Sequence, residues 1–190
     1  EQAELKQYVL VRFFHEIALK GGNRAFFIRR MIENLEEALR GTGVSRIERR
    51  SMGALLPLQS EQQWQLLQER LGGLIGVERF ARTWRVEPSL QSLKKAIAQL
   101  LEGQTTRSFR ITARRSDKSF PLSSPQINHE LGAFVQGLTG LSVDLQNPDL
   151  NLQIYIYPRE ALVALQEFPG LSGMPVGVSG PVAVLLSGGI

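Results

Sequence analysis

The stretch Tyr8-Val9-Leu10-Val11-Arg12-Phe13-Phe14 sets the fold of the first part of this 190-residue chain. It is rich in β-branched, aliphatic and aromatic residues, which predicts a strand. Apolar residues then recur at near-helical spacing between Phe26 and Leu39. Asn23 stands in the position of an N-cap, and Gly41 follows the last apolar position. The sequence therefore predicts a strand followed by an amphipathic helix.

Strand and helix signals continue through the next fifty residues. The expected elements are strands over 44–49, 53–58 and 77–86 and a helix over 61–71. The resulting order, β-α-β-β-α-β, is that of the ferredoxin-like split βαβ arrangement, in which both helices cover one face of a sheet. A unit of about 75 residues buries a small core and is marginal alone, so we expect it to pack closely against its neighbour.

A second, α/β unit follows. Its expected elements are a helix over 90–101, a strand over 107–113, a helix with Ser124 as N-cap and Pro125 as first residue, and strands over 141–145, 152–157 and 161–165. Apolar residues of the first strand alternate with Arg110, Thr112 and Arg114, which predicts a half-buried strand with an arginine-bearing outer face. The segment from Phe168 to Gly180 is rich in glycine and proline and has no regular spacing of apolar residues. This composition predicts a connecting segment packed against its surroundings.

The composition excludes several kinds of site. The chain has no cysteine, which excludes disulfides, thiolate metal ligands and a cysteine nucleophile, and two histidines cannot form a His-rich metal site. We assign no catalytic residue and no metal ligand. No run approaches the ~20 apolar residues of a membrane span, and the first residues lack the pattern of a signal peptide. We therefore expect a cytoplasmic protein without membrane contact.

Positive charge is concentrated in the first two thirds of the chain. The net charge is +4, and Arg159 is the only basic residue after Lys118. Most of the basic residues are arginines, whose planar guanidinium suits phosphate better than the point charge of lysine does. The pattern favours a polyanionic partner, and a basic solvated surface without a dedicated partner is the alternative.

Two basic clusters are candidates for phosphate contact. The denser one, at a strand end and in the turn after it, consists of Arg110, Arg114, Arg115 and Lys118. So many cations in one short span can bind several phosphates, although ordinary surface ion pairs with Asp117 are the alternative. The second, in a glycine-bearing loop before a helix N-terminus, consists of Lys20, Asn23 and Arg24. A phosphate could bind there, and a plain capping turn is the alternative.

The last ten residues resemble the start of a nucleotide-binding domain. The apolar run Val182-Ala183-Val184-Leu185-Leu186 feeds the turn Ser187-Gly188-Gly189. Many α/β nucleotide domains begin in this way, because glycines let backbone N–H groups close around phosphate oxygens. We therefore expect the chain to be the front part of a longer protein whose chemistry lies beyond Ile190.

Six blocks of sequence, in their order along the chain, together resemble the tRNA 4-thiouridine synthetase family, also called tRNA sulfurtransferases. They are Glu-Ile-Ala-Leu-Lys-Gly-Gly-Asn-Arg at 16–24, Ala-Arg-Arg-Ser-Asp-Lys-Ser-Phe-Pro at 113–121, Ile-Asn at 127–128, Val-Asp-Leu-Gln-Asn-Pro-Asp at 143–149, Gly-Met-Pro-Val-Gly at 173–177 and Leu-Ser-Gly-Gly-Ile at 186–190. The resemblance implies an α+β and α/β architecture in four parts. These are a ferredoxin-like domain over 1–75, a tRNA-binding THUMP domain over 76–168, a connector over 169–180 and the start of a PP-loop ATP pyrophosphatase domain over 181–190.

The resemblance also implies an activity. In such proteins ATP adenylates a uridine in tRNA, and a cysteine persulfide delivers the sulfur. The positions that match the RNA-facing motifs, toward the acceptor stem and its 3′ end, are Lys20, Asn23, Arg24, Arg114, Arg115 and Lys118. The positions that match the loop approaching ATP, bound with Mg²⁺, are Leu185, Leu186, Ser187, Gly188 and Gly189.

The implied partners are tRNA, a cysteine desulfurase or another persulfide donor, and a second copy of the chain in a homodimer. Whether the parent protein also serves thiamine synthesis stays open. The chain departs from the family in three respects: the Asp-Ser that follows the family's loop after Ile190 is absent, no cysteine is present to carry a persulfide, and Phe13-Phe14-His15 replaces a Tyr-Gly before Glu16. With the catalytic domain absent, we expect this piece to hold tRNA without modifying it.

Two other functions remain open from the sequence. The chain could be the RNA-binding front half of another tRNA-modifying enzyme, such as a methyltransferase or deaminase, since THUMP-like modules are shared. It could instead be a regulatory or dimerisation module of a PP-loop small-molecule ligase. Retention of tRNA separates this last alternative from the others.

Overall fold

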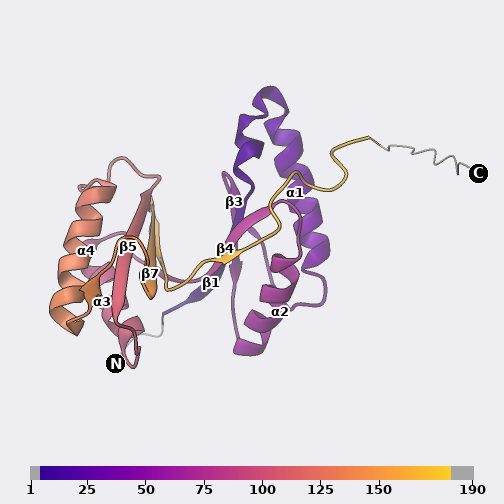
Figure 1. The fold of residues 1–190 in the computed structure, drawn as a ribbon. Coiled ribbons are helices and arrows are strands. Elements are labelled where there is room, and N and C mark those ends of the chain that lie inside the picture. Colours follow the sequence, from indigo (N-terminus) through magenta and orange to yellow (C-terminus); the bar gives the residue numbers. More distant parts are fainter. Residues whose placement is uncertain (1–4, 181–190) are drawn as a thin grey trace, which may run out of the picture.

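The computed structural model describes residues 5–180 (Figure 1). The predicted PP-loop strand and its Ser-Gly-Gly turn, over 181–190, lie outside the described residues. Two halves are visible in Figure 1, each with strands on its inner side and helices on its outer side.

The first half has the predicted β-α-β-β-α-β order. Its elements are β1 (Gln7–Phe13), α1 (Arg24–Ala38), β2 (Glu48–Arg50), β3 (Gly53–Pro57), α2 (Glu61–Gly72) and β4 (Val77–Val86). Two short 3₁₀ helices that the sequence analysis did not predict, η1 (His15–Leu19) and η2 (Gly21–Asn23), connect β1 to α1. Both helices cover one face of the sheet, as expected, because Val9, Val11 and Phe13 of β1 are buried against them.

Asn23 occupies the N-cap position of α1, as predicted, but its side chain makes no capping hydrogen bond, because it ends η2 with helical backbone angles (φ −89°, ψ −4°) instead of the extended ones typical of a capping residue. One local prediction in this half is wrong. The strand expected over 44–49 is confined to Glu48–Arg50. Gly41 and Gly43, both with positive φ, prolong the turn after α1 and delay the strand.

The second half contains the other two helices. Its elements are α3 (Leu90–Leu101), β5 (Ser108–Arg115), α4 (Ser124–Thr139), β6 (Ser142–Val143), β7 (Leu150–Tyr157) and β8 (Glu160–Ala164). The predicted strand over 141–145 is shortened to two residues. Asp144 accepts hydrogen bonds from the backbone N–H groups of Gln146 and Asn147 at 2.9 and 3.0 Å, and this turn ends β6.

The N-cap of α4 is displaced by one residue from the prediction. Ser123, not Ser124, is the N-cap, and it forms a capping box with Gln126 while Pro125 lies in the first turn. The backbone N–H of Ser123 donates to Gln126 Oε1 at 2.8 Å. Both serines could cap the helix, but only Ser123 has a polar side chain, that of Gln126, three residues later to complete a capping box.

All strands belong to one sheet. Its order is β2-β3-β1-β4-β8-β7-β5-β6, and the short β9 (Phe168–Pro169) also pairs with β4. One edge of β4 pairs with β1 from Val77 to Trp84, and the other pairs with β8 from Trp84 to Val86. β4 thus joins the two halves by backbone hydrogen bonds. The domain limits at 75 and 168 stay a prediction.

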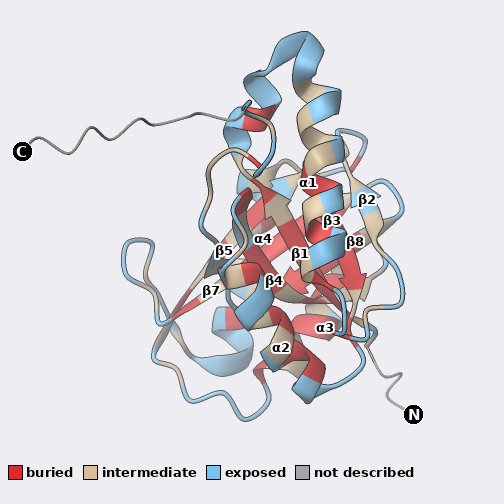
Figure 2. Ribbon diagram, turned by 90° about the vertical axis from the view of Figure 1, so that its right-hand side faces the viewer, coloured by how far each residue is buried: buried red, intermediate tan, exposed pale blue. Residues whose placement is uncertain are grey.

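The helix-free faces of the two halves meet. Tyr8, Leu10, Leu55 and Ala81 of the first half pack in one buried cluster with Tyr155, Leu162 and Ala164 of the second. In Figure 1 the helices α1 and α2 lie on the outside of one half and α3 and α4 on the outside of the other. Figure 2 shows the buried strands between these layers. Residues of the first half at the edge of this cluster therefore lie opposite residues of the second half.

The connecting segment packs on the first half. Gly170 N–H donates to Glu78 O at 3.0 Å, and a Cβ at Gly170 would lie 2.3 Å from Val77 O, which leaves room only for glycine. Farther along, Val176 O accepts hydrogen bonds from Arg30 and Asn34 of α1, each at 3.1 Å. Within residues 5–180, no helix combines the length and apolar character needed to cross a membrane.

Candidate nucleic-acid interface

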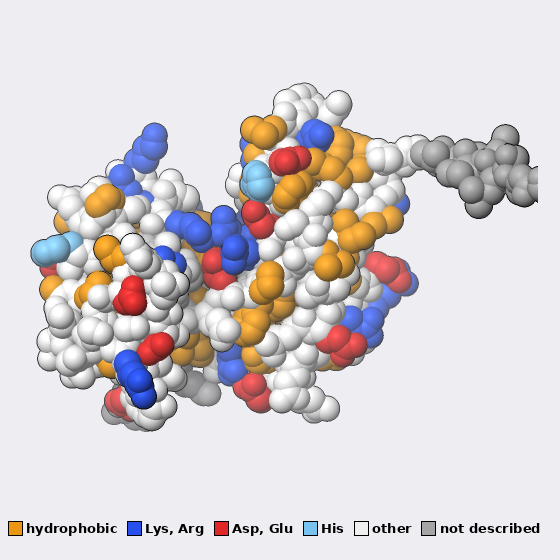
Figure 3. All heavy atoms as spheres, viewed as in Figure 1, with side chains coloured by type: hydrophobic (Ala, Val, Ile, Leu, Met, Phe, Trp, Pro, Cys, Tyr) orange, Lys and Arg blue, Asp and Glu red, His pale blue; other side chains and the backbone are white. Residues whose placement is uncertain are grey.

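A cleft of about 360 Å³ opens at the rim of the central apolar cluster. The first half contributes β1 and the turn between β2 and β3, and the second half contributes the ends of β5 and β7. Its charged lining residues are all arginines: Arg12, Arg50, Arg114 and Arg115. Figure 3 shows basic side chains gathered in the hollow between the halves, with acidic ones among them.

Strand alternation places the arginines on the helix-free faces. In β1, Tyr8 and Leu10 belong to the central cluster, so Arg12 continues the same face. Arg79 of β4 is the register partner of Arg12. In β5, the alternate residues Phe109, Ile111 and Ala113 pack under the helices, so Arg114 points the other way. The two halves of the sheet thus direct cations toward each other.

Glu167 lies between these arginines. Its side chain is only 9% exposed, and its carboxylate lies 3.1 Å from Arg114 Nη1, 3.5 Å from Arg12 Nη1 and 4.0 Å from Arg79 Nε. Arg12 and Arg79 belong to the first half and Arg114 to the second. One carboxylate therefore binds guanidinium groups from both halves.

Tyr155 completes this cluster. Its hydroxyl donates to Glu167 Oε1. Burial, and then the negative charge of Glu167, raise the pKa of Tyr155 far above its ordinary value. The phenol therefore stays protonated and remains a donor. Because Tyr155 is buried in the central cluster, its ring is used for packing and not for stacking on bases.

The cluster retains donors for an anion. Three arginines surround one carboxylate, and their side chains are 33% (Arg12), 50% (Arg79) and 43% (Arg114) exposed. A guanidinium has five N–H donors, and Glu167 occupies only part of this capacity. A net positive, partly exposed cluster of this kind suits the phosphates of a nucleic-acid backbone.

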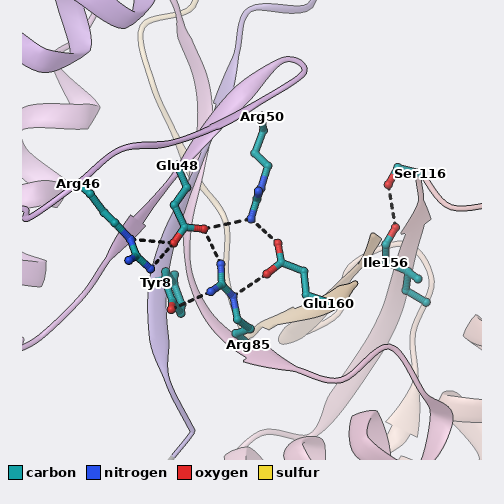
Figure 4. A network of polar contacts seen from close by, with 8 residues as sticks. All are labelled: Tyr8, Arg46, Glu48, Arg50, Arg85, Ser116, Ile156 and Glu160. Atoms are coloured by element: carbon teal, nitrogen blue, oxygen red, sulfur yellow. Dashed lines mark hydrogen bonds and ion pairs between the residues drawn. The ribbon is translucent and has the colours of Figure 1, made fainter. Parts of the chain in front are cut away.

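A second network of ion pairs also joins the halves (Figure 4). Glu48 of β2 accepts from Arg46 and Arg85, each with a closest distance of 2.7 Å. Arg85 also pairs with Glu160 of the second half at 2.6 Å, and Arg50 contacts both Glu48 and Glu160. Burial works against ionisation of Glu48, but the hydrogen bonds from Arg85 and Arg46 outweigh it and lower its pKa.

The residues predicted on β5 and its loop have different environments. Arg114 lies in the cleft, as described. Arg115 also lines it, but its Nη1 donates to the carbonyls of Phe120 and Leu122 at 3.0 and 3.1 Å, so this guanidinium braces the loop. Lys118 is exposed in that loop. Arg110 donates to Leu145 O at 2.9 Å and does not line the cleft.

The residues predicted before α1 reach the cleft through one contact. Arg24 Nη2 donates to Ser51 Oγ at 3.0 Å, and Ser51 lines the cleft. Lys20 Nζ lies 5.4 Å from the centre of the Phe27 ring, and Asn23 is exposed. In Figure 1 this segment and the β5–α4 loop lie at the same end of the two halves.

Sequence reasoning missed Arg12 and Arg50, which line the cleft, and Arg79 and Glu167, which form a cluster with Arg12 and Arg114 beside it. For Arg12 a signal existed, because it is the lone charge within a strand that is otherwise largely apolar. Arg79 had no such signal, since its strand also carries Glu78, Arg82 and Arg85. Glu167 had no local signal, since its arginine partners lie 53 to 155 positions away. The predicted ATP-contacting positions, 185–189, lie outside the described residues.

Comparison with known proteins gives two family matches. Residues 8–81 match the ThiI ferredoxin-like domain, and residues 87–166 match the THUMP domain. The chain is 47% identical over 186 residues to a probable tRNA sulfurtransferase of Thermus thermophilus, an alignment that covers 98% of this chain and 46% of the relative. The chain spans about half the length of the curated relatives it matches.

Solved structures agree with these matches. A crystal structure of a 4-thiouridine synthetase–RNA complex with bound ATP is 29% identical, with a TM-score of 0.70 over 92% of this chain and 44% of that one. The crystal structure of PH1313 from Pyrococcus horikoshii is 26% identical, with a TM-score of 0.78 over 90% of this chain and 57% of that one. The ferredoxin-like and THUMP fold expected from the sequence is confirmed. The chain therefore belongs to the tRNA sulfurtransferase family, of which it carries the ThiI ferredoxin-like and THUMP domains.

Proposed function

We propose that this chain is the tRNA-docking part of an ATP-dependent tRNA sulfurtransferase that makes 4-thiouridine. The observation that carries the proposal is the arginine-lined cleft between the two halves, with Glu167 holding Arg12, Arg79 and Arg114. The named relatives and the solved synthetase–RNA complex support the same function.

The cleft binds tRNA through its phosphates and its shape. Guanidinium groups donate to phosphate oxygens, which position the RNA without reading its sequence, and the A-form geometry of an acceptor stem supplies the shape. Lys118 and Arg24 extend the basic surface along the end of the molecule where the β5–α4 loop and the start of α1 lie. The tRNA is thereby presented to a catalytic domain that follows the chain.

Other properties of the whole protein belong to this proposal. ATP with Mg²⁺ binds at a PP-loop that begins with Leu185–Gly189, a persulfide donor such as a cysteine desulfurase supplies sulfur, and two copies form a homodimer. The protein acts in the cytoplasm, and the 190-residue piece holds tRNA without modifying it. A parallel role in thiamine synthesis is compatible with the proposal and is not needed for it.

A filter-binding titration of the chain with tRNA at several salt concentrations tests the proposal. Replacing Arg12 or Arg114 with Ala weakens binding, and each variant lowers the slope of log affinity against log salt by about one, since one phosphate contact is lost. Arg70→Ala is the control, because Arg70 lies in the last turn of α2 on the helix-covered side.

Two results would contradict the proposal. If tRNA is held no better than a scrambled duplex at physiological salt, the small-molecule ligase module becomes the better assignment. If tRNA binds but the slopes of the two cleft variants match those of Arg70→Ala, the RNA lies elsewhere on the chain.

A further inference from the structure

Glu167 is placed unusually for a carboxylate beside a phosphate-binding surface. A negative charge there repels phosphate, yet its side chain is only 9% exposed and contacts three arginines and a tyrosine. The side chain comes from the segment between β8 and β9, which crosses from one half to the other. This placement requires an explanation beyond a surface ion pair.

The contacts of Glu167 fix the arginines in space. Arg12 and Arg79 are neighbours on adjacent strands, and Arg114 faces them from the other half. Without a carboxylate between them, three like charges would separate into solvent. With it, the three guanidinium groups converge on one point, and each remains at least a third exposed.

We infer that Glu167 is a positioning residue for RNA: it pre-arranges Arg12, Arg79 and Arg114 as one phosphate-binding group. This inference rests on the proposed function. Tyr155 supports the arrangement, since its hydroxyl donates to the same carboxylate oxygen that Arg12 and Arg114 contact. The ligand class is a nucleic-acid backbone, in which one or two phosphates lie across both halves at once.

The alternative is that Glu167 simply weakens RNA binding by its charge. Positioning of the arginines raises the RNA affinity, whereas charge repulsion lowers it. Ordering one long side chain on binding costs roughly twofold to tenfold in affinity, and three side chains are concerned. The negative charge of Glu167 is largely neutralised by the three guanidinium groups that contact it, and its repulsion of a phosphate opposes binding by about one such factor. Positioning therefore outweighs repulsion.

The test is Glu167→Gln in the 190-residue chain, assayed for tRNA affinity by filter binding. Glutamine keeps the shape and can still accept from Tyr155, but it does not hold three cations. We expect affinity to fall by roughly fivefold to twentyfold, although the net charge becomes more positive. Glu61→Gln makes the same charge change on α2, at a side chain 61% exposed, and is expected to leave affinity unchanged or slightly raised.

A double-mutant cycle with Arg114→Ala separates positioning from a general loss of structure. If Glu167 acts through the arginines, its substitution has a smaller effect once Arg114 is gone, whereas a structural defect adds independently. Tighter binding by Glu167→Gln, or full additivity in the cycle, overturns the inference. If the parent chain itself does not bind tRNA, the proposed function fails instead, so the two failures are distinguishable.

A milder pair of variants keeps the inference testable if Glu167→Gln does not fold. Tyr155→Phe removes one donor to Glu167 without changing charge or ring packing. Tyr8→Phe is its matched control, because the Tyr8 hydroxyl belongs to the same central cluster but contacts Arg85 instead of Glu167. We expect roughly a twofold to fivefold loss of affinity for the first and none for the second. Equal affinities of the two variants overturn the inference.

Discussion

At the scale of single residues, the structure separates two neighbours that the sequence treats alike. Arg114 and Arg115 were predicted to be equivalent phosphate contacts. Strand alternation directs their side chains differently, so that Arg114 contacts Glu167 whereas Arg115 donates to the carbonyls of Phe120 and Leu122. A cluster of cations in one short span therefore contains both a binding residue and a loop brace.

Arg115→Ala is expected to lower stability more than it lowers RNA binding. Two buried or partly buried carbonyls lose a charged donor, which costs about 1–3 kcal/mol of unfolding free energy. The salt slope of tRNA binding stays near that of the parent chain, in contrast to Arg114→Ala. Urea unfolding and filter binding measure the two quantities. A slope reduced by about one at unchanged stability would restore Arg115 as a phosphate contact.

At the scale of elements, helices and long strands were predictable and short strands were not. The limits of β4 and α3 match the prediction at both ends. In α3 the apolar residues recur at helical spacing along the whole helix. β2 and β6 are short because turns beside them take up residues that have strand-like composition. The length of β2 depends on the positive φ angles of Gly41 and Gly43, and the length of β6 depends on the turn formed by Asp144. Neither feature can be predicted from the spacing of apolar residues.

The cap of α4 gives a test at this scale. Ser123→Ala removes the capping box and is expected to cost about 1 kcal/mol of unfolding free energy. Ser124→Ala is the matched control: this serine is the first helical residue and caps nothing, so its substitution is expected to change stability by a few tenths at most. Thermal or urea unfolding measures both. A larger loss for Ser124→Ala would support the N-cap predicted from the sequence.

At the scale of the whole molecule, the sequence indicated which two folds were present but not how they meet. Each half could be predicted from its own periodicity. The joint depends on β4 pairing on both edges and on Glu48, Glu160 and Glu167, whose partners are distant in sequence. The cleft exists only because of this joint. That is why Arg114 could be found from the sequence whereas its partner Glu167 could not.

The ion-pair network of Glu48 makes the joint sensitive to acid. Since Arg85 and Arg46 lower the pKa of Glu48 in the folded chain, its ionised form stabilises the fold. This contribution is fully present above the ordinary pKa of 4.5 and is lost as the pH falls through the lowered value. Glu48→Gln should therefore lower stability at pH 7 by about 1–3 kcal/mol and show a shallower loss below pH 5 than the parent chain.

Urea unfolding between pH 7 and pH 3 measures this dependence. Glu37→Gln is the control, because Glu37 forms an exposed pair with Arg40 on α1 and its side chain is 65% exposed. Equal pH profiles for Glu48→Gln and Glu37→Gln would show that the network contributes nothing to stability. If the unfolding free energy of Glu48→Gln falls more steeply with acid than that of the parent chain, ionised Glu48 destabilises the fold. The central apolar cluster and the shared strand β4 would then hold the two halves together without the network.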